Sequence, residues 1–356
     1  MPVPALSDLR LISAGAVTSL GNDLPSTSAA IIAALDNFAD THFVDGRNQP
    51  LSGAAFTLPE IEDRPGARRG GAGKLGLALS WAIEECLAES GVSLPLPANV
   101  PLLFLGDDAR PAPVVEMAHL CQSACSRHFL RPDRLVMHAF MSGEAASVVA
   151  LRAARKHLAA GAPYVLVAAA DSWLRVPDIQ QGLQYERLLC TDNAGGFVPG
   201  EAAAAVLLAG PHSPALPTHA PTLRIEGLGT AEEPAPLLSE DNCYGQGLAA
   251  AMREALTEAG WAAHEVHLTL SDSAGERYFS NELAYAWARL LRQAQPPGND
   301  YVQAASRVGH VGVAFGPLLL AHVWQLARLG RAAGPKSLIQ LSSLQPLRGA
   351  IAARIE

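Results

Sequence analysis

Cysteine and positive charge are both scarce in this chain, and each scarcity excludes a class of protein. The five cysteines are an odd number with no disulfide framework, which favours a reducing compartment. The 26 Lys and Arg residues are outnumbered by 34 Asp and Glu residues, for a net charge of −8, and there is no basic run or basic-aromatic pattern. We therefore expect a cytoplasmic protein that does not bind nucleic acid.

A membrane-spanning run is also missing. The first 15 residues have no basic region followed by a long apolar core, so no secretory signal is predicted. The most apolar stretch, 311–327, is interrupted by His322 and Gln325. It is too short and too polar at its ends for a membrane span, and we interpret it as a buried core helix.

The chain does contain enough apolar material for a large core. Hydrophobic residues make up 49% of the 356 residues, which suits one α/β unit of two similar halves as well as two domains. Residues 164–170 form a continuous apolar run, typical of a strand buried on both faces of a sheet. Weak repeats relate 9–15 to 223–229 and 76–91 to 247–260, which indicates a duplication.

The pattern around residue 140 predicts a strand, a tight corner and a helix. Residues 134–138 are β-branched or apolar, 141–143 (MSG) form the corner, and 144–160 are rich in Ala and Leu. Such an elbow aims one side chain along a helix N-terminus, whose free N–H groups favour a developing negative charge, so a nucleophile belongs there. Here that position carries Phe140, whose ring cannot attack or ionise.

Four segments together resemble a β-ketoacyl synthase of the thiolase superfamily: the elbow, 11–23 (LISAGAVTSLGND), 195–208 (GGFVPGEAAAAVLL) and 306–326. The resemblance implies an α/β, thiolase-like fold with duplicated βαβαβ halves in a layered αβαβα arrangement. The halves would be 1–210 and 222–356, joined by the Pro-rich linker 211–221. Members of the family are dimers, so the resemblance also implies a homodimer or a heterodimer.

The same resemblance implies a degenerate active site. The family's cysteine aligns with Phe140, its first histidine with Ser273, its lysine with Ala305, and only the second histidine is kept, as His310. Its Gly-rich gate is replaced by four other residues: Gln345, Pro346, Leu347 and Arg348. Acyl transfer needs a nucleophile, a base and oxyanion donors, so we predict a pseudo-enzyme without cofactor or metal.

His310 has two interpretations. It could act alone as a general base, but without a nucleophile it has no triad to serve, so a histidine packed and hydrogen-bonded at a helix start is the preferred interpretation. We expect Phe140 to fill the former acyl pocket, although flexible methionines can also line an apolar groove. The residues predicted to line that pocket are its neighbours Met137, Met141 and Ser142.

Two further clusters contain residue types that could form a metal or carboxylate site. Cys121 and Cys125, beside His119 and His128, have a spacing that could hold zinc, but small buried side chains on a helix are the simpler interpretation. The pair 107–108 (Asp-Asp) would form a carboxylate site only if another group converges on it. Neither cluster predicts a metal.

The loss of chemistry leaves two main hypotheses for function. In the first, the chain is an adaptor or chaperone for a bacterial type VI secretion effector; the stretch 41–54 (THFVDGRNQPLSGA) resembles proteins of that group. In the alternative, the chain resembles the chain-length factor that completes the pocket of an active polyketide, aryl polyene or fatty-acid ketosynthase. An enzyme with relocated chemistry, using His310 or Cys190, is the third possibility.

Overall fold

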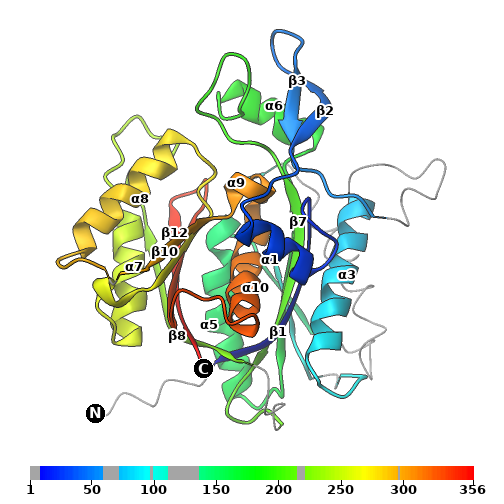
Figure 1. Cartoon of the computed structure of the whole chain (residues 1–356), viewed down its shortest axis with the longest axis vertical. Helices are drawn as coiled ribbons and strands as arrows, with labels where there is room; N and C mark the ends of the chain where they lie inside the picture. The colour runs from blue at the N-terminus through cyan, green and yellow to red at the C-terminus, as the bar shows by residue number, and fades with distance from the viewer. Residues whose placement is uncertain (1–8, 59–71, 97–98, 111–135, 215–220, 296) are drawn as a thin grey trace.

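The computed structural model describes residues 9–58, 72–96, 99–110, 136–214, 221–295 and 297–356 (Figure 1). In this part of the chain, ten strands form one mixed sheet in the order β10-β9-β11-β12-β8-β1-β7-β6-β4-β5. The strands of the N-terminal half are β1 (Arg10–Thr18), β4 (Leu102–Leu105), β5 (Met137–Phe140), β6 (Val165–Ser172) and β7 (Glu201–Ala209). Those of the C-terminal half are β8 (Leu223–Glu232), β9 (Leu268–Ser271), β10 (Asp300–Gln303), β11 (Lys336–Ser342) and β12 (Leu347–Ile355).

The two halves of the sheet have the same topology. β1-β7-β6-β4-β5 in one half corresponds strand by strand to β8-β12-β11-β9-β10 in the other. In each half the first two pairings are antiparallel and the last two are parallel. The halves join where Arg10 and Leu11 pair with Arg224 and Leu223. The predicted duplicated α/β fold is confirmed.

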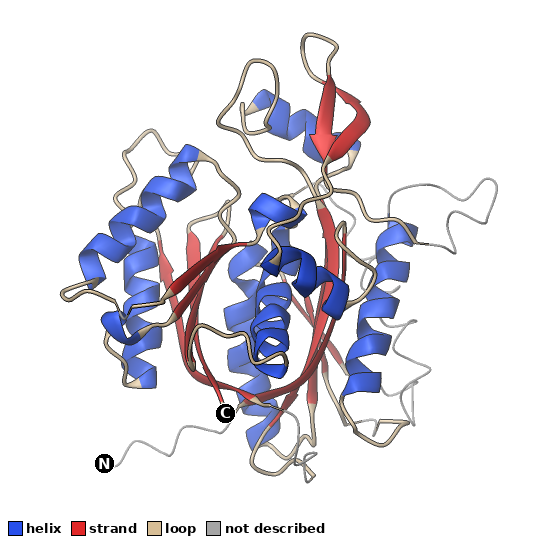
Figure 2. Cartoon of the chain, in the orientation of Figure 1, coloured by secondary structure: helices blue, strands red, loops and turns tan. Residues whose placement is uncertain are grey.

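Helices lie outside and between the two halves (Figures 1 and 2). α5 (Ala146–Ala159) and α10 (Phe315–Arg328) share one apolar core with strands of both halves. α3 (Ala72–Glu89) packs on the outer face of the N-terminal strands, and α7 (Gln246–Ala259) on the outer face of the C-terminal strands. α8 (Arg277–Leu290) joins α7 there. This gives the predicted αβαβα layering.

The buried helix α10 explains the apolar stretch of the sequence. Every residue from 315 to 326 in α10 is buried, including His322 and Gln325, because strands face the helix on more than one side. Among the described residues, no helix is long and apolar enough to cross a membrane. The interpretation of this segment as a core helix is confirmed.

Several boundaries differ from those predicted. The helix expected from 144 begins at Ala146, after the 3-10 turn η2 (Gly143–Ala145). The strand expected from 350 begins at Leu347, so half of the predicted gate belongs to β12. A hairpin of β2 (Ala39–Val44) and β3 (Pro50–Gly53) was not predicted at all.

The remaining described elements are short. They are α1 (Leu24–Ile32), α6 (Val176–Gln184), α9 (Ala305–Val308), and the 3-10 turns η3 (Ala263–Glu265) and η4 (Gly312–Ala314). The hairpin β2–β3 and α6 lie together beyond one end of the sheets, at the top of Figure 1. The proposed zinc cluster at 119–128 lies outside the described residues.

Candidate functional site

Two similar elbows meet at the centre of the molecule. In each half a short 3-10 turn precedes the central helix: η2 before α5, and η4 before α10. Both turns begin with a glycine in the left-handed region, Gly143 with φ +63° and Gly312 with φ +53°. At Gly312 a side chain is also excluded by space, because its Cβ would lie 2.0 Å from Oδ2 of Asp171. His310 precedes its glycine by two residues, as Met141 does in the other elbow.

His310 is packed among aromatic rings. Its ring centroid lies 5.0 Å from that of Trp173, 4.7 Å from that of Phe197 and 5.7 Å from that of Phe315. Its backbone N–H donates to the carbonyl of Val198 at 2.7 Å, which fixes the approach to the elbow. The prediction of a histidine packed at a helix start agrees with this geometry, although Nδ1 of the ring has no hydrogen-bond partner in the described part of the chain.

Glu144 faces His310, and the sequence did not predict its role. Its Oε1 lies 3.5 Å from Nε2 of His310, and both side chains are buried. Burial, together with the charge of Asp107, raises the pKa of Glu144 to about 8. Burial also lowers the pKa of His310 well below its usual value, helped by the charges of Arg187 and Arg110.

These shifts make the contact a neutral pair. Near pH 7 the Glu144 carboxyl keeps its proton, and the His310 imidazole is uncharged. Among the residues that the structure describes, the second carboxyl oxygen of Glu144 has no hydrogen-bond partner, and neither does Nδ1 of His310. A neutral acid beside a neutral imidazole can share one proton, but neither group supplies the nucleophile that acyl transfer requires.

A buried ionic network holds the helix starts in place. Nη1 of Arg110 donates to Oδ2 of Asp171 at 2.5 Å, and its Nε donates to Oδ1 of Asp178 at 3.0 Å. The guanidinium also stacks on Trp173, 4.2 Å from the ring centroid. Asp171 in turn accepts the N–H of Val313 at 3.1 Å, which ties η4 to the end of β6. The network therefore fixes Trp173 and η4, which lie beside His310.

Phe140 and Met137 lie on opposite faces of the sheet. Phe140 ends β5 and packs against the central core that contains α5 and α10. Met137 packs against the outer core that contains α3, because side chains alternate along a strand. Of the residues predicted to line one pocket, Met137 is therefore separated from Phe140.

The elbow residue Ser142 contacts the hairpin of the predicted gate. Its carbonyl accepts a hydrogen bond from Oγ of Ser343 at 2.9 Å, and the N–H of Ala145 donates to the same hydroxyl at 3.0 Å. Ser142 also forms a bridge with Asp107. Asp107 is buried, and burial raises its pKa. The first aspartate of the 107–108 pair thus does converge on the elbow, whereas Asp108 accepts the side-chain N–H of Gln345 at 2.9 Å.

The positions aligned with the first histidine and the lysine have structural roles. The carbonyl of Ser273 accepts from Nε2 of Gln303 at 2.9 Å, and its N–H donates to Oγ of Ser271 at 3.0 Å. Ala305 is buried at the start of α9. Neither side chain offers a base or a cation to His310.

The predicted gate is an anchored turn. Arg348 is completely buried in β12, where its Nε donates to Oε1 of Glu282 at 2.7 Å. Its Nη1 donates to the carbonyls of Ser343 at 2.9 Å and Gln345 at 2.6 Å. Arg348 therefore fixes the turn that contains Pro346 and Leu347, a role that the sequence comparison with a gate did not predict.

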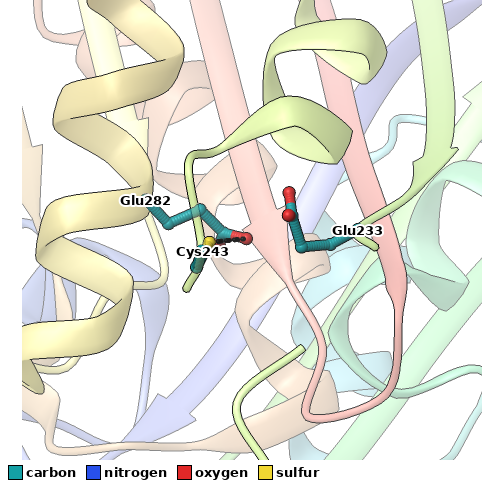
Figure 3. Close-up of side chains that lie close together, drawn as sticks. All are labelled: Glu233, Cys243 and Glu282. Carbon is teal, nitrogen blue, oxygen red and sulfur yellow. Dashed lines mark hydrogen bonds between the residues drawn. The ribbon is translucent and has the colours of Figure 1, made fainter. Parts of the chain in front are cut away.

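One group of side chains has the composition of a metal site (Figure 3). Ligand atoms of Glu233, Cys243 and Glu282 lie within 4.8 Å of one another. However, Glu282 is already paired with Arg348, and Oε2 of Glu233 accepts the N–H of Gly247 at 2.7 Å at the start of α7. Because N–H donors of the protein already pair with both carboxylates, the group is better explained as a structural cluster than as a metal centre.

Cys190 borders the aromatic wall without joining the pair. It is partly buried against the cluster that contains Trp173 and Phe197. Its backbone exchanges hydrogen bonds with Asn193, each at 3.1 Å. The structure thus places a free thiol against the cluster that supplies two of the rings around His310.

Comparison with known proteins was made by sequence and by structure. No protein-family model matches the chain, and no curated protein matches it by sequence. Solved structures do match. The ishigamide ketosynthase/chain length factor matches with a TM-score of 0.71 at 18% identity, over 98% of this chain and 99% of that one. A ketosynthase in complex with its chain length factor from Xenorhabdus doucetiae matches with a TM-score of 0.69 at 12% identity, over 100% of both chains.

A third structure contains a type II PKS acyl-carrier protein in complex with its ketosynthase, and it matches with a TM-score of 0.76 at 13% identity, over 98% of this chain and 99% of that one. The chain has the ketosynthase fold. The predicted thiolase-like architecture is confirmed by these matches, although identities this low show the fold alone. In this chain the two elbows meet where Glu144 faces His310, and Phe140 ends the strand that leads into the first elbow.

Proposed function

We propose that the chain is a non-catalytic subunit that binds a ketosynthase, in the manner of a chain-length factor. Two of the matched structures pair a ketosynthase with a chain length factor, and both cover almost all of this chain. That likeness supports the alternative function predicted from the sequence more than it supports the adaptor. In this proposal the protein works in the cytoplasm, beside the biosynthetic enzyme.

The observation that carries the proposal is the chemistry of the elbow. Phe140 stands at the end of β5, where a thiol is expected, and Glu144 in the next turn keeps its proton near pH 7. A protonated carboxyl and a benzyl group cannot form an acyl-enzyme. The cations that act on His310, Arg110 and Arg187, are already paired with carboxylates, so they do not take the place of the missing oxyanion donors.

An exposed edge of the sheet supports the proposal that the chain binds a partner subunit. β5 is the last strand in the sheet order, and its outer side pairs with no other strand among the described residues. Val136, just before it, is 44% exposed, and His138 and Ala139 are exposed as well. Unpaired edges readily accept another strand, so a second ketosynthase-fold subunit could extend this sheet.

The test is to isolate the chain from its native host and identify the proteins that come with it. A stoichiometric ketosynthase that carries the elbow cysteine is the expected result. The chain alone should show no malonyl decarboxylation and no condensation above background. Turnover by the purified chain would overturn the non-catalytic assignment.

The adaptor hypothesis is distinguished by the same isolation. It depends on the stretch 41–54, which forms most of the hairpin β2–β3. The structures named above include no secretion-system protein, so the adaptor hypothesis has only sequence features behind it: this stretch, a shortened N-terminal half and the missing nucleophile. Recovery of a secreted toxin or spike component, with no ketosynthase, would favour the adaptor over the chain-length factor.

A further inference from the structure

A cavity of about 790 Å³ lies between the hairpin β2–β3 and the start of α6, well away from the elbows in sequence. Figure 1 shows these two elements side by side above the ends of the sheets. The floor of the cavity is formed by Lys74 at the start of α3 and Glu201 at the start of β7. A volume of this size falls in the range of roughly 300–1,000 Å³ that small-molecule sites occupy.

The lining of the cavity combines apolar side chains with polar ones, among them Asn37, Thr41, His42 and Thr57. Phe43 comes from the hairpin, and Leu174 and Val176 come from the residues that lead into α6. Phe43 and Leu174 are partly buried, whereas Val176 is 56% exposed at the rim. These three side chains favour an aliphatic or aromatic group that leaves water.

The charges around the cavity cancel. Two cations, Lys74 and Arg175, are matched by two anions, Glu201 and Asp40. Lys74 and Glu201 form a buried ion pair on the floor, with Lys74 only 9% exposed. An anionic ligand that reached Lys74 would meet the Glu201 carboxylate at the same place, so its charge would gain little.

Lys74 keeps hydrogen-bonding capacity that Glu201 has lost. An ammonium group has three N–H donors, and among the described residues Lys74 has one hydrogen-bond acceptor, Glu201. Its ammonium also lies 4.3 Å from the ring centroid of Phe56. Glu201 instead accepts from the N–H of Phe56 at 3.1 Å and from Oγ of Ser172 at 3.2 Å, in addition to Lys74. The floor can therefore donate to a ligand far better than it can accept from one.

We propose that this cavity binds a neutral acyl compound, an amide or ester whose carbonyl oxygen accepts from Lys74 while its aliphatic chain lies along Phe43, Leu174 and Val176. A carbonyl uses the spare N–H donors without placing a second negative charge beside Glu201. The site is separate from the elbow and does not depend on the proposed ketosynthase partner. It would give this chain a ligand of its own.

The test is calorimetric titration of the full chain with octanamide and, in parallel, with octanoate at pH 7.5. Octanamide is expected to bind saturably, and octanoate at least about tenfold more weakly. Val176→Trp should weaken octanamide binding at least about tenfold, because the indole fills the rim of the cavity. The matched control is Val44→Trp, also at an exposed valine (45%) but outside the lining, and it should leave the affinity unchanged.

The carbonyl contact is tested separately. Lys74→Met alone leaves Glu201 buried without its partner, so it is combined with Glu201→Gln. The double variant should lose about tenfold in octanamide affinity while retaining the cooperative unfolding of the parent. Octanoate binding as tightly as octanamide would overturn the neutral-acyl assignment, and no saturable octanamide binding, or equal effects of Val176→Trp and Val44→Trp, would overturn the site itself.

Discussion

Oε1 of Glu144 lies 3.5 Å from Nε2 of His310, and this contact joins the elbow of the N-terminal half to that of the C-terminal half. Both side chains are buried, and within the described part of the chain each has one polar atom without a hydrogen-bond partner. Both groups are uncharged near pH 7, which lowers the cost of burying them.

Restoring the thiol is not expected to restore chemistry. Phe140→Cys places a sulfur at the elbow, but Ser273 and Ala305 still supply neither a base nor a cation. Condensation and malonyl decarboxylation by this variant should stay at the background of the unsubstituted chain. Appreciable turnover by the single variant would show that His310 and Glu144 already form a working acid-base site.

Glu144→Gln is expected to change how stability depends on pH. Because the folded-state pKa of Glu144 is raised to about 8, its contribution to stability is complete below the unfolded value of 4.5 and is lost as pH rises through about 8. The loss is at most about 1.4 kcal/mol per pH unit for one proton. Glutamine is uncharged at every pH, so the variant should not show this loss.

The measurement is urea unfolding of both proteins between pH 6.5 and 8.5. His310 does not confuse the window, since its lowered folded-state pKa makes it lose stability only as pH falls below 6.5. The neighbouring residues Asp107, Asp171 and Arg110 are kept in the variant. Glu232→Gln, at an exposed position, is the control. Parallel stability curves for parent and Glu144→Gln would mean that Glu144 is already ionised in the fold.

Removing the buried arginine of the gate hairpin should destabilise the protein strongly. Arg348→Met leaves Glu282 buried without its cation, which costs about 3–5 kcal/mol. Arg354→Met, on the same strand as Arg348, removes the ion pair with Glu226 of β8. The Arg354 side chain is 33% exposed, so this loss should cost about 1 kcal/mol or less. Chemical unfolding measures both.

A second variant separates the missing charge from the missing packing. Adding Glu282→Gln to Arg348→Met should recover part of the loss, because the carboxylate no longer needs a partner. If the double variant is as unstable as the sum of both single variants, the ion pair does not account for the effect.

A charge on the free sheet edge should weaken the proposed complex. Ala139→Glu puts a carboxylate on exposed β5, where a second subunit would pair, while the monomer tolerates it at the surface. Co-purification with the ketosynthase should fall at least about tenfold. Tyr301→Glu, on β10 at the opposite edge of the sheet and 46% exposed, should leave it unchanged. Equal losses from both variants would place the interface elsewhere.

Local sequence patterns were sufficient to predict the main elements of the fold, because each pattern involves residues close together in the chain. The apolar run at 164–170 predicted β6, because a strand buried on both faces is continuously apolar. The alanine-rich stretch after the corner predicted α5, because it has helical spacing. The hairpin β2–β3 was not predicted because four of the six residues of β2 are polar or small enough to resemble a loop. The order of the segments then implied the duplication that the sheet confirms.

By itself the sequence determined the elements, their duplication and the aromatic residue at the elbow, because each depends on residues close together in the chain. The tertiary structure alone decided which charges meet. Glu144 faces His310, Arg348 lies against Glu282, and Lys74 reaches Glu201 only after segments far apart in the sequence have packed. The physical reason is burial. A carboxyl or ammonium group acquires its partner, and an altered pKa, from the elements that pack around it and exclude water. Those elements are distant in the sequence, so no local pattern predicts them.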